Sequence, residues 1–274
     1  MASIGTRKNR SGGLTYRSIR KGTIIANRLH PDVLSGGYLN YNGRGQPLLT
    51  LATMAAVASG ADTVEHIAYL GGVGGVGLHY WPIGAVAQAV KGPQAAADGL
   101  RLDFDAFAGD GANYVPGGLL GPFSRTIERT AGAVIPGGVF IRWQGILEDV
   151  SGAAEFAVGF RKSEAIQALI DGFDEMAALN VQAGTVNTET ILNNAATVTR
   201  ATGKTWADTE EHELVATCAG NGKVAYYFDG SKVGVDFQFD DGEVVVPFMH
   251  LLLGADLTTV NTKALEVGSL EQLQ

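Results

Sequence analysis

From about Gly99 to Leu270, apolar and polar residues alternate with a period of two, in short runs bounded by Gly, Asp or Asn. Successive side chains of a β-strand point to opposite faces of a sheet, so this period predicts half-buried strands. The strands are expected at Leu100–Asp105, Val139–Leu147, Glu155–Arg161, Glu175–Val181, Thr185–Leu192, His212–Cys218, Lys223–Phe228, Val233–Phe239, Val244–Leu253 and Thr262–Val267. About ten short strands, spaced about 8–12 residues apart, are typical of an all-β sandwich or jelly roll. Residues 96–274 are therefore expected to form one β-sandwich domain.

The residues between these runs favour turns. The chain has 38 Gly in 274 residues, about twice the usual share of roughly 7%. Ala219–Gly222 joins two expected strands and contains the Asn-Gly signal of a hairpin. Glu164–Ile170 has helical spacing and predicts about two turns of helix. In the connecting region, residues 48–95, we expect a short helix at Leu48–Ala58 and a strand at Val64–Leu70.

Charge is distributed unevenly along the chain. Residues 1–47 hold eight Lys and Arg against one acid, Asp32, a local balance of +7; the rest must carry −15 to give the net charge of −8. This segment is rich in Gly, Ser and Asn and has no amphipathic stripe, which is typical of an extended arm that docks on a charged surface. We expect its basic side chains to be interaction residues: Arg7, Lys8, Arg10, Arg17, Arg20, Lys21, Arg28 and Arg44.

A basic arm can also neutralise nucleic-acid phosphates. However, Tyr16, Tyr38 and Tyr41 are the only aromatic residues in the arm that could stack on bases. The acidic body would also repel nucleic acid. Docking on acidic protein surfaces, including copies of this chain's own body, is therefore the favoured interpretation, and nucleic acid is the weaker one.

One glycine motif has the spacing of a dinucleotide-binding loop. Gly72–Gly77 matches G-x-G-x-x-G, but such a loop needs a following helix whose N-terminus faces the phosphates. Here the aromatic, proline-broken stretch Leu78–Pro82 follows. We interpret the motif as a glycine turn and expect no nucleotide cofactor.

The sequence offers no recognisable metal site. The histidines are scattered and have neither an H-E-x-x-H spacing nor a Cys partner: His30, His66, His79, His212 and His250. Glu211 and Glu213 share one face of their strand and His212 lies on the other, which favours a solvated strand edge. Three acids around a turn, Asp103, Asp105 and Asp110, lack the spacing of an EF-hand. The acidic stretch Asp240–Glu243 is likewise interpreted as a tight turn.

Catalytic signatures are weak. Glycoside hydrolysis needs two carboxylates that face each other across a cleft; Glu148, Glu155, Glu175 and Glu189 are expected on strands, which leaves a hydrolase or lyase as a minor alternative. Ser124, Ser151 and Ser163 lack the G-x-S-x-G frame of a nucleophile elbow. We therefore expect a protein that is not an enzyme and has no catalytic residues.

The cysteine count and the hydropathy bear on the compartment. Cys218 is the only cysteine, which excludes an internal disulfide framework. The N-terminus has no charged start followed by an apolar h-region, and the apolar run around Leu48–Ala58 is too short to span a bilayer. Synthesis in a reducing compartment, without a membrane partner, is expected.

Several runs resemble a group of structural proteins of tailed bacteriophages, many from marine hosts. The runs are Gly145–Lys162, Thr188–Asn194, Trp206–Asp208 with Glu211–Leu214, and Phe239–Phe248. The strand order, with Val224–Gly230 and its Tyr/Phe-x-Asp-Gly turn before the last strands, is similar to that of concanavalin-A-like lectin sandwiches. The resemblance covers about residues 95–270. It implies a virion component with a jelly-roll or concanavalin-A-like β-sandwich, and its lectin-like relatives bind glycans, often with Ca²⁺.

The resemblance and the basic arm together lead to a functional expectation. The favoured function is a capsid decoration or cement protein, made in the host cytoplasm and located on the virion's capsid surface. Its partners would be the major capsid protein and copies of itself, as a trimer or dimer. One alternative is a tail- or fibre-associated lectin-like module, which exposed Trp81 or Trp206 would support. Another is the major capsid protein itself, although its long spine helix is not expected here.

Overall fold

The computed structural model describes residues 46–47, 66–69, 77–84, 94–96, 99–102, 108–121, 123–129, 137–256 and 258–270. The chain divides into two units, Met1–Ser35 and Gly36–Gln274, and all described residues belong to the second unit. The eight basic residues of the arm and the helix expected at Leu48–Ala58 lie outside the described residues.

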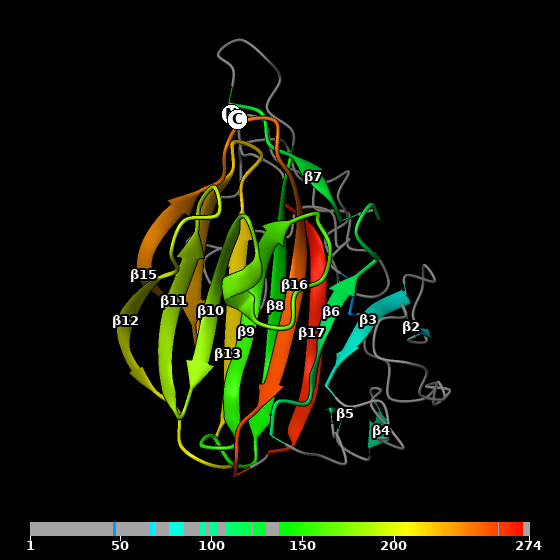
Figure 1. The fold of residues 1–274 in the computed structure, drawn as a ribbon, viewed down its shortest axis with the longest axis vertical. Helices are drawn as coiled ribbons and strands as arrows, with labels where there is room; N and C mark the ends of the chain where they lie inside the picture. The colour runs from blue at the N-terminus through cyan, green and yellow to red at the C-terminus, as the bar shows by residue number, and fades with distance from the viewer. Residues whose placement is uncertain are drawn as a thin grey trace, which may run out of the picture. The chain divides into compact units, whose positions relative to one another are not determined.

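The described residues form two antiparallel β-sheets that pack face to face, which makes an all-β jelly-roll or concanavalin-A-like sandwich (Figure 1). Sheet A has the strand order β15-β14-β13-β8-β17-β5-β4, and β1 also pairs with β17. Its strands are β1 (Gln46–Pro47), β4 (Gln94–Ala96), β5 (Gly99–Leu102), β8 (Gly138–Leu147), β13 (Glu211–Cys218), β14 (Lys223–Phe228), β15 (Ser231–Gln238) and β17 (Val260–Leu270).

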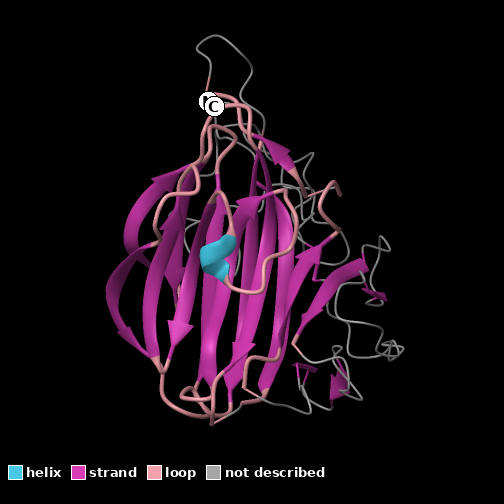
Figure 2. Cartoon of the chain, in the orientation of Figure 1, coloured by secondary structure: helices cyan, strands magenta, loops and turns pink. Residues whose placement is uncertain are grey.

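Sheet B has the strand order β12-β11-β10-β9-β16-β6-β3-β2, and β7 also pairs with β16. Its strands are β2 (His66–Tyr69), β3 (Gly77–Ile83), β6 (Gly111–Pro116), β7 (Arg125–Thr126), β9 (Ala153–Lys162), β10 (Met176–Gln182), β11 (Thr185–Ile191), β12 (Val198–Thr205) and β16 (Val244–Leu253). One short 3₁₀ helix, η5 (Ile170–Gly172), lies in front of sheet B in Figure 2.

The main core fills the space between the two sheets. Trp143 of sheet A and Phe156 of sheet B meet there edge to face, with ring centroids 4.8 Å apart. Trp143 is fully buried, and its Nε1 donates a hydrogen bond to Thr262 Oγ1 over 2.9 Å. Burial of such large aromatic side chains supplies a large share of the stabilisation of a sandwich, because each removes about 150–250 Å² from water.

The period-two runs are confirmed as strands, except that residues 103–105 of the first run lie outside the described residues, and the hairpin at Ala219–Gly222 joins β13 to β14. Val64–Leu70 contains β2, which pairs with β3 in sheet B. The helix expected at Glu164–Ile170 is wrong, since the segment is irregular up to η5. Its Ile166 and Ile170 have helical spacing, but Ile170 is buried in a hydrophobic cluster beside sheet B, and Ile166 lines a pocket.

Candidate functional site

The outer face of sheet B, turned away from sheet A, has an apolar half and a polar half. Met249 and Leu251 of β16 point into the core between the sheets, so Phe248 and His250 point outward. The sheet residues of the apolar half are Val115, Ala157, Met176, Ala178, Ile191, Val246 and Phe248. The polar half, which we call the polar row, carries Asn113, Glu155, Asn180, Glu189 and His250 at outward positions.

Strand register brings these residues together from distant parts of the sequence. Trp81 of β3 is paired with Asn113 of β6, and Asn113 is paired with His250 of β16. His250 is paired with Ala157 of β9, and Ala157 with Asn180 of β10. One line across five strands therefore runs from an aromatic residue through an amide and an imidazole to a second amide.

The centre of the polar row is a contact between Asn113, His250 and Glu155. His250 Nδ1 lies 3.2 Å from Asn113 Oδ1, and His250 Nε2 lies 3.0 Å from Glu155 Oε2. Asn113 and His250 are fully buried, and the Glu155 side chain is 12% exposed. Both imidazole nitrogens thus face oxygen acceptors, which fixes the orientation of the ring.

Asn180 and Glu189 continue the polar row toward β11. Asn180 Nδ2 donates to Glu189 Oε2 over 3.0 Å, and Thr199 Oγ1 donates to Glu189 Oε1 over 3.3 Å. Glu189 is buried, and this burial raises the pKa of its carboxyl above the ordinary value. The negative charges of Glu155 and Asp171 raise that pKa further, against the lowering effect of the two hydrogen bonds.

A segment that we call the strap, Ser163–Phe173, crosses the outer face of sheet B. At its start, Ser163 N donates to Val244 O over 2.7 Å and Ser163 Oγ donates to Leu119 O over 2.5 Å. At its end, Ile170 and Phe173 are buried in the apolar cluster. The strap also contacts the polar row twice: Asn113 Nδ2 donates to Gln167 O over 2.8 Å, and Ile170 N donates to Glu155 Oε2 over 3.3 Å.

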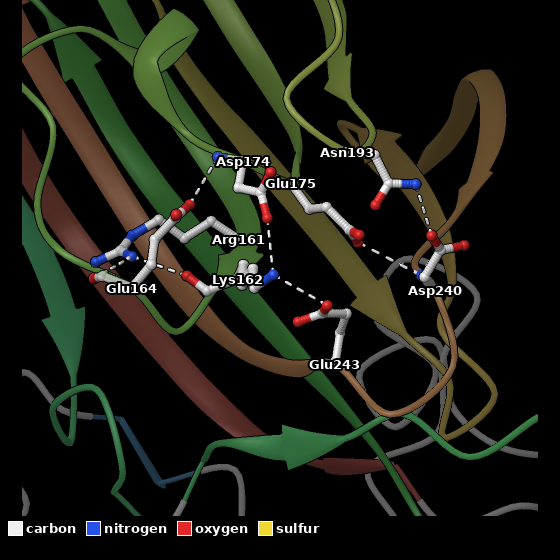
Figure 3. A network of polar contacts seen from close by, with 8 residues as sticks. All are labelled: Arg161, Lys162, Glu164, Asp174, Glu175, Asn193, Asp240 and Glu243. Atoms are coloured by element: carbon white, nitrogen blue, oxygen red, sulfur yellow. Dashed lines mark hydrogen bonds and ion pairs between the residues drawn. The ribbon is translucent and has the colours of Figure 1, made fainter.

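A buried arginine anchors the first end of the strap (Figure 3). Arg161 Nη1 donates to Lys162 O over 2.9 Å and to Glu164 O over 3.2 Å, and the guanidinium lies 4.6 Å from the centre of the Phe173 ring. Burial lowers the pKa of Arg161 to about 10, although Glu164 acts in the opposite direction. Arg161 therefore ties both ends of the strap to β9 through hydrogen bonds and a cation–π contact.

A network of charged groups lies next to this anchor (Figure 3). Lys162 Nζ is 2.7 Å from Asp174 Oδ2 and 3.0 Å from Glu243 Oε1, and these hydrogen bonds raise the pKa of Lys162. Glu175 is buried and accepts a hydrogen bond from Asp240 N over 3.4 Å, while burial raises its pKa. The network holds the end of the strap near Asp174, and we assign it a role in stabilising the fold.

A pocket of about 440 Å³ opens between the strap and strand β3. It is lined by Trp81, Pro82, Ile83, Gly84, Leu119, Ala165, Ile166, Gln167 and Ala168. Trp81 is partly exposed, and Gln167 brings an amide. No charged side chain is among these lining residues, so the pocket offers an aromatic surface and neutral polar groups.

The described part of the chain contains no group of three or more His, Cys, Asp or Glu side chains arranged to hold a metal ion. Within the same residues, no helix is long and apolar enough to cross a membrane. Strand β3 begins at Gly77, the last glycine of the G-x-G-x-x-G motif, where a dinucleotide loop would require a helix.

The residues singled out in the sequence have varied positions. Trp206 is buried among Trp143, His212 and Phe228, so the expectation that it could be an exposed binding residue is wrong. Glu211 and Glu213 do face away from His212: they contact Lys263 and Arg142 respectively, whereas His212 lies 2.7 Å from Asp229 Oδ2.

Of the four carboxylates considered for catalysis, two share the polar row. Glu155 and Glu189 lie on the outer face of sheet B, whereas Glu175 belongs to the network near Asp240, and Glu148 accepts a hydrogen bond from Asn261. Asp110 is buried at the start of β6. Asp103 and Asp105 lie outside the described residues.

Sequence reasoning missed Asn113 and Gln167. β6 is buried at every position, so no alternation marks Asn113 as an outward residue. Gln167 lies within the segment for which the sequence predicts a helix. The sequence does hold one indication of Asn113: it is a polar residue in the otherwise apolar stretch Gly111–Pro116, which suggests a buried side chain with hydrogen-bond partners.

No family model matches this chain, and no curated protein matches it. Solved structures with a similar fold include a carbohydrate-binding module from Bacillus subtilis, with a TM-score of 0.42 and 13% identity over 67% of this chain and 94% of the module. A seed lectin of Lotus tetragonolobus gives a TM-score of 0.45 and 8% identity over 66% of this chain and 92% of the lectin. An alginate lyase from Pseudomonas aeruginosa gives a TM-score of 0.44 and 12% identity over 65% of this chain and 85% of the lyase. At these levels the similarity concerns the fold alone.

Proposed function

We propose that this protein is a non-catalytic, lectin-like module that binds a neutral carbohydrate in the pocket between the strap and β3. The observation that carries the proposal is the lining of this pocket, in which partly exposed Trp81 lies with the Gln167 amide and no charged side chain. A sugar ring has apolar C–H faces and polar hydroxyl edges, which match an aromatic surface beside amide and backbone groups.

The size of the pocket agrees with this ligand class. Its volume of about 440 Å³ lies in the lower part of the range that small-molecule sites occupy, about 300–1,000 Å³. One or two sugar rings are the expected occupants. A nucleotide or another phosphate would need cationic or helix N-terminal groups, which the lining residues do not offer.

A catalytic role is not favoured by the environment of the polar row. His250 and Asn113 are fully buried beneath the strap, and Glu155 is committed to His250 and Ile170 N. A general acid or base must come within hydrogen-bond reach of its substrate, and with the strap closed these groups cannot reach a ligand in the Trp81 pocket. We therefore assign these groups to binding and positioning.

The test is to titrate the full-length protein with a panel of neutral mono- and oligosaccharides by calorimetry. Wild-type protein should bind at least one member, and Trp81→Ala should weaken that binding at least about tenfold, which corresponds to about 1.4 kcal/mol. Tyr227→Ala is the matched control, because Tyr227 is a partly exposed aromatic residue on sheet A. Equal affinity of Trp81→Ala and wild-type protein would refute the assignment of the pocket.

As a second candidate, we propose that the protein decorates a virion capsid through its N-terminal segment. The supporting observation is the charge separation between residues 1–47, at +7, and the remainder, at −15. Arg and Lys side chains of the segment would contact acidic patches on the major capsid protein and on copies of this chain. The end of the segment, β1, pairs with β17 and so joins it to sheet A.

Copy number per particle tests this second role. Quantitative mass spectrometry of purified particles should find hundreds of copies if the protein decorates a shell. A handful or a few dozen copies would instead favour a tail location, where a glycan-binding module would act. Replacing the eight Arg and Lys of the segment by Gln should release the protein from a shell, and retained binding would contradict the charge argument.

A further inference from the structure

The middle of the strap, Ala165–Leu169, crosses the polar row without packing into it. Ala165 and Ala168 are exposed, and Leu169 is 50% exposed despite its apolar side chain. The side chains that line the adjoining pocket in this stretch are those of Ala165, Ile166, Gln167 and Ala168. These five residues therefore contribute little apolar burial on sheet B, in contrast to Ile170 and Phe173 that follow.

Both ends of this middle section are firmly held. Before it, Ser163 is bonded to Val244 O and Leu119 O, and Glu164 O accepts from Arg161. After it, Ile170 and Phe173 are buried in the apolar half. Within it, the hydrogen bond from Asn113 to Gln167 O is the tie to sheet B among the described residues. A short segment with fixed ends and one such tie can open locally while the sandwich stays folded.

The surface beneath the strap is unusually polar for a covered sheet face. Asn113, Asn180 and His250 are fully buried and Glu189 is 3% exposed, whereas the other half of the same face carries apolar residues around the buried Arg161. Burial of polar groups costs free energy unless each is hydrogen-bonded. Asn113, Asn180 and Glu189 have hydrogen-bond partners, whereas His250 Nε2 lies 3.0 Å from Glu155 Oε2 without hydrogen-bond geometry. All of these groups can bond to a hydroxyl-rich ligand.

We propose that Ala165–Leu169 opens as a lid and extends the Trp81 pocket into a groove along the polar row, so that the protein binds an oligosaccharide of several residues. This inference rests on the proposed function and specifies its ligand. Register provides the path, because Trp81, Asn113 and His250 lie side by side on adjacent strands. One sugar occupies the pocket at Trp81, and following sugars meet the amides and carboxylates of the row.

The charge of the row determines which oligosaccharide fits. Glu155 and Glu189 both present carboxylates on this face, where they accept hydrogen bonds from Ile170 N and Asn180 Nδ2 respectively. Sugar hydroxyl groups are such donors, whereas a chain of uronic acids would bring like charges to the same surface. The groove is therefore selective for neutral oligosaccharides.

Hydrogen exchange measured by mass spectrometry tests the lid without a ligand. Amides of residues 165–169 should exchange at least about tenfold faster than those of β9 and β16, through local opening. Asn113→Asp should accelerate exchange in the strap further, because it removes the donor to Gln167 O while the new carboxylate still faces His250. Asn193→Asp is the matched control, since Asn193 Nδ2 donates to Asp240 at another site. Strap amides that exchange only with global unfolding would overturn the lid.

Titration with glucose and with neutral glucose and mannose oligomers of two to six residues tests the groove. Affinity should rise at least about tenfold from the monosaccharide to the best oligomer, and that oligomer should slow exchange of the strap in wild-type protein. An oligogalacturonate of equal length should bind more weakly. Monosaccharide binding that depends on Trp81 but does not increase with length would overturn the groove and leave the proposed function intact. If no sugar binds, both fail.

Discussion

At the scale of single residues, Glu189 shows how a carboxyl group is held in the covered face of sheet B. It is 3% exposed, and its oxygens accept hydrogen bonds from Asn180 and Thr199. Burial and the charges of Glu155 and Asp171 raise its pKa above the ordinary value of 4.5. The folded protein therefore holds the proton of Glu189 more tightly than the unfolded chain does.

This pKa shift has a defined sign for stability. As pH rises through the window from the ordinary pKa to the raised one, the folded state binds more protons, so the free energy of unfolding falls. Glu189→Gln stays neutral and can still accept from Asn180. It should be more stable than wild-type protein at about pH 7.5, and this advantage should shrink toward about pH 4, as measured by urea unfolding at each pH.

Glu210→Gln provides the opposite control. Glu210 is exposed, and its pKa is lowered chiefly by the hydrogen bond from Ala207 N, so its removal should lower stability at neutral pH relative to acid. A Glu189→Gln variant whose stability relative to wild-type protein does not change with pH would contradict the account of Glu189.

Thr262 is a second residue whose role is testable. Its hydroxyl accepts the hydrogen bond of Trp143 Nε1, and both side chains are fully buried. Thr262→Val keeps the shape but leaves the indole N–H without a partner, so the free energy of unfolding should fall by about 1–3 kcal/mol. Chemical unfolding monitored by tryptophan fluorescence measures it, and exposed Thr126→Val should change stability by less than about 0.5 kcal/mol. Equal losses in both variants would contradict the assigned hydrogen bond.

At the scale of elements, the close approach of β9 and β10 depends on Gly159. A Cβ added there would lie 2.3 Å from Ala177 O and 2.6 Å from Ala178 Cα, both backbone atoms of β10. Gly159→Ala should therefore push the strands apart and destabilise the protein by about 2–3 kcal/mol in chemical unfolding.

The comparison for this prediction is Gly203→Ala. Gly203 has a φ of +74° and nothing within 4 Å of an added Cβ. Gly203→Ala should therefore lower the free energy of unfolding only by the backbone strain, about 1 kcal/mol. If Gly159→Ala were the milder of the two, the strand spacing would not depend on this glycine.

The elements also show why the sequence predicted some strands and missed others. β14 has one face in the core and one that is partly exposed, so alternation reveals it, whereas β13 is buried at its last five positions. β6 is buried throughout and β12 is exposed at nearly every position, and neither gives a period of two. Ile166 and Ile170 of the strap have helical spacing although the strap is not a helix. Ile166 lines the pocket, whereas Ile170 is buried in the apolar cluster. Periodicity reports burial, and it fails where both faces have the same environment.

At the scale of the whole molecule, the fold class followed from the sequence but the candidate site did not. The site combines Trp81, Asn113, Gln167 and His250, which belong to three strands and the strap. Which strands become neighbours, and in which register, depends on packing between distant segments that composition and spacing do not encode. The sequence alone indicates Trp81 as a supporting residue for a lectin, whereas its partners required the topology of sheet B.

The division of the chain into two units leads to a further prediction. The buried hydrophobic residues of the described core all lie after residue 77, and Met1–Ser35 forms a separate unit. A chain that begins at Gly36 should keep cooperative thermal unfolding, with a midpoint within about 4 °C of the full-length protein. Circular dichroism at the same protein concentration measures it. Loss of cooperative unfolding would mean that the first unit is part of the folding domain.

Binding of a neutral carbohydrate between the strap and β3 can be observed through the hydrogen-exchange footprint of a bound oligosaccharide on the wild-type protein. We predict that slower exchange includes residues 77–84, 117–121 and 163–170, which surround the pocket and the proposed lid. Peptides from the outer face of sheet A, around Arg142 and Glu213, should be unchanged. A footprint on sheet A, or binding that leaves the strap and β3 unprotected, would contradict the account.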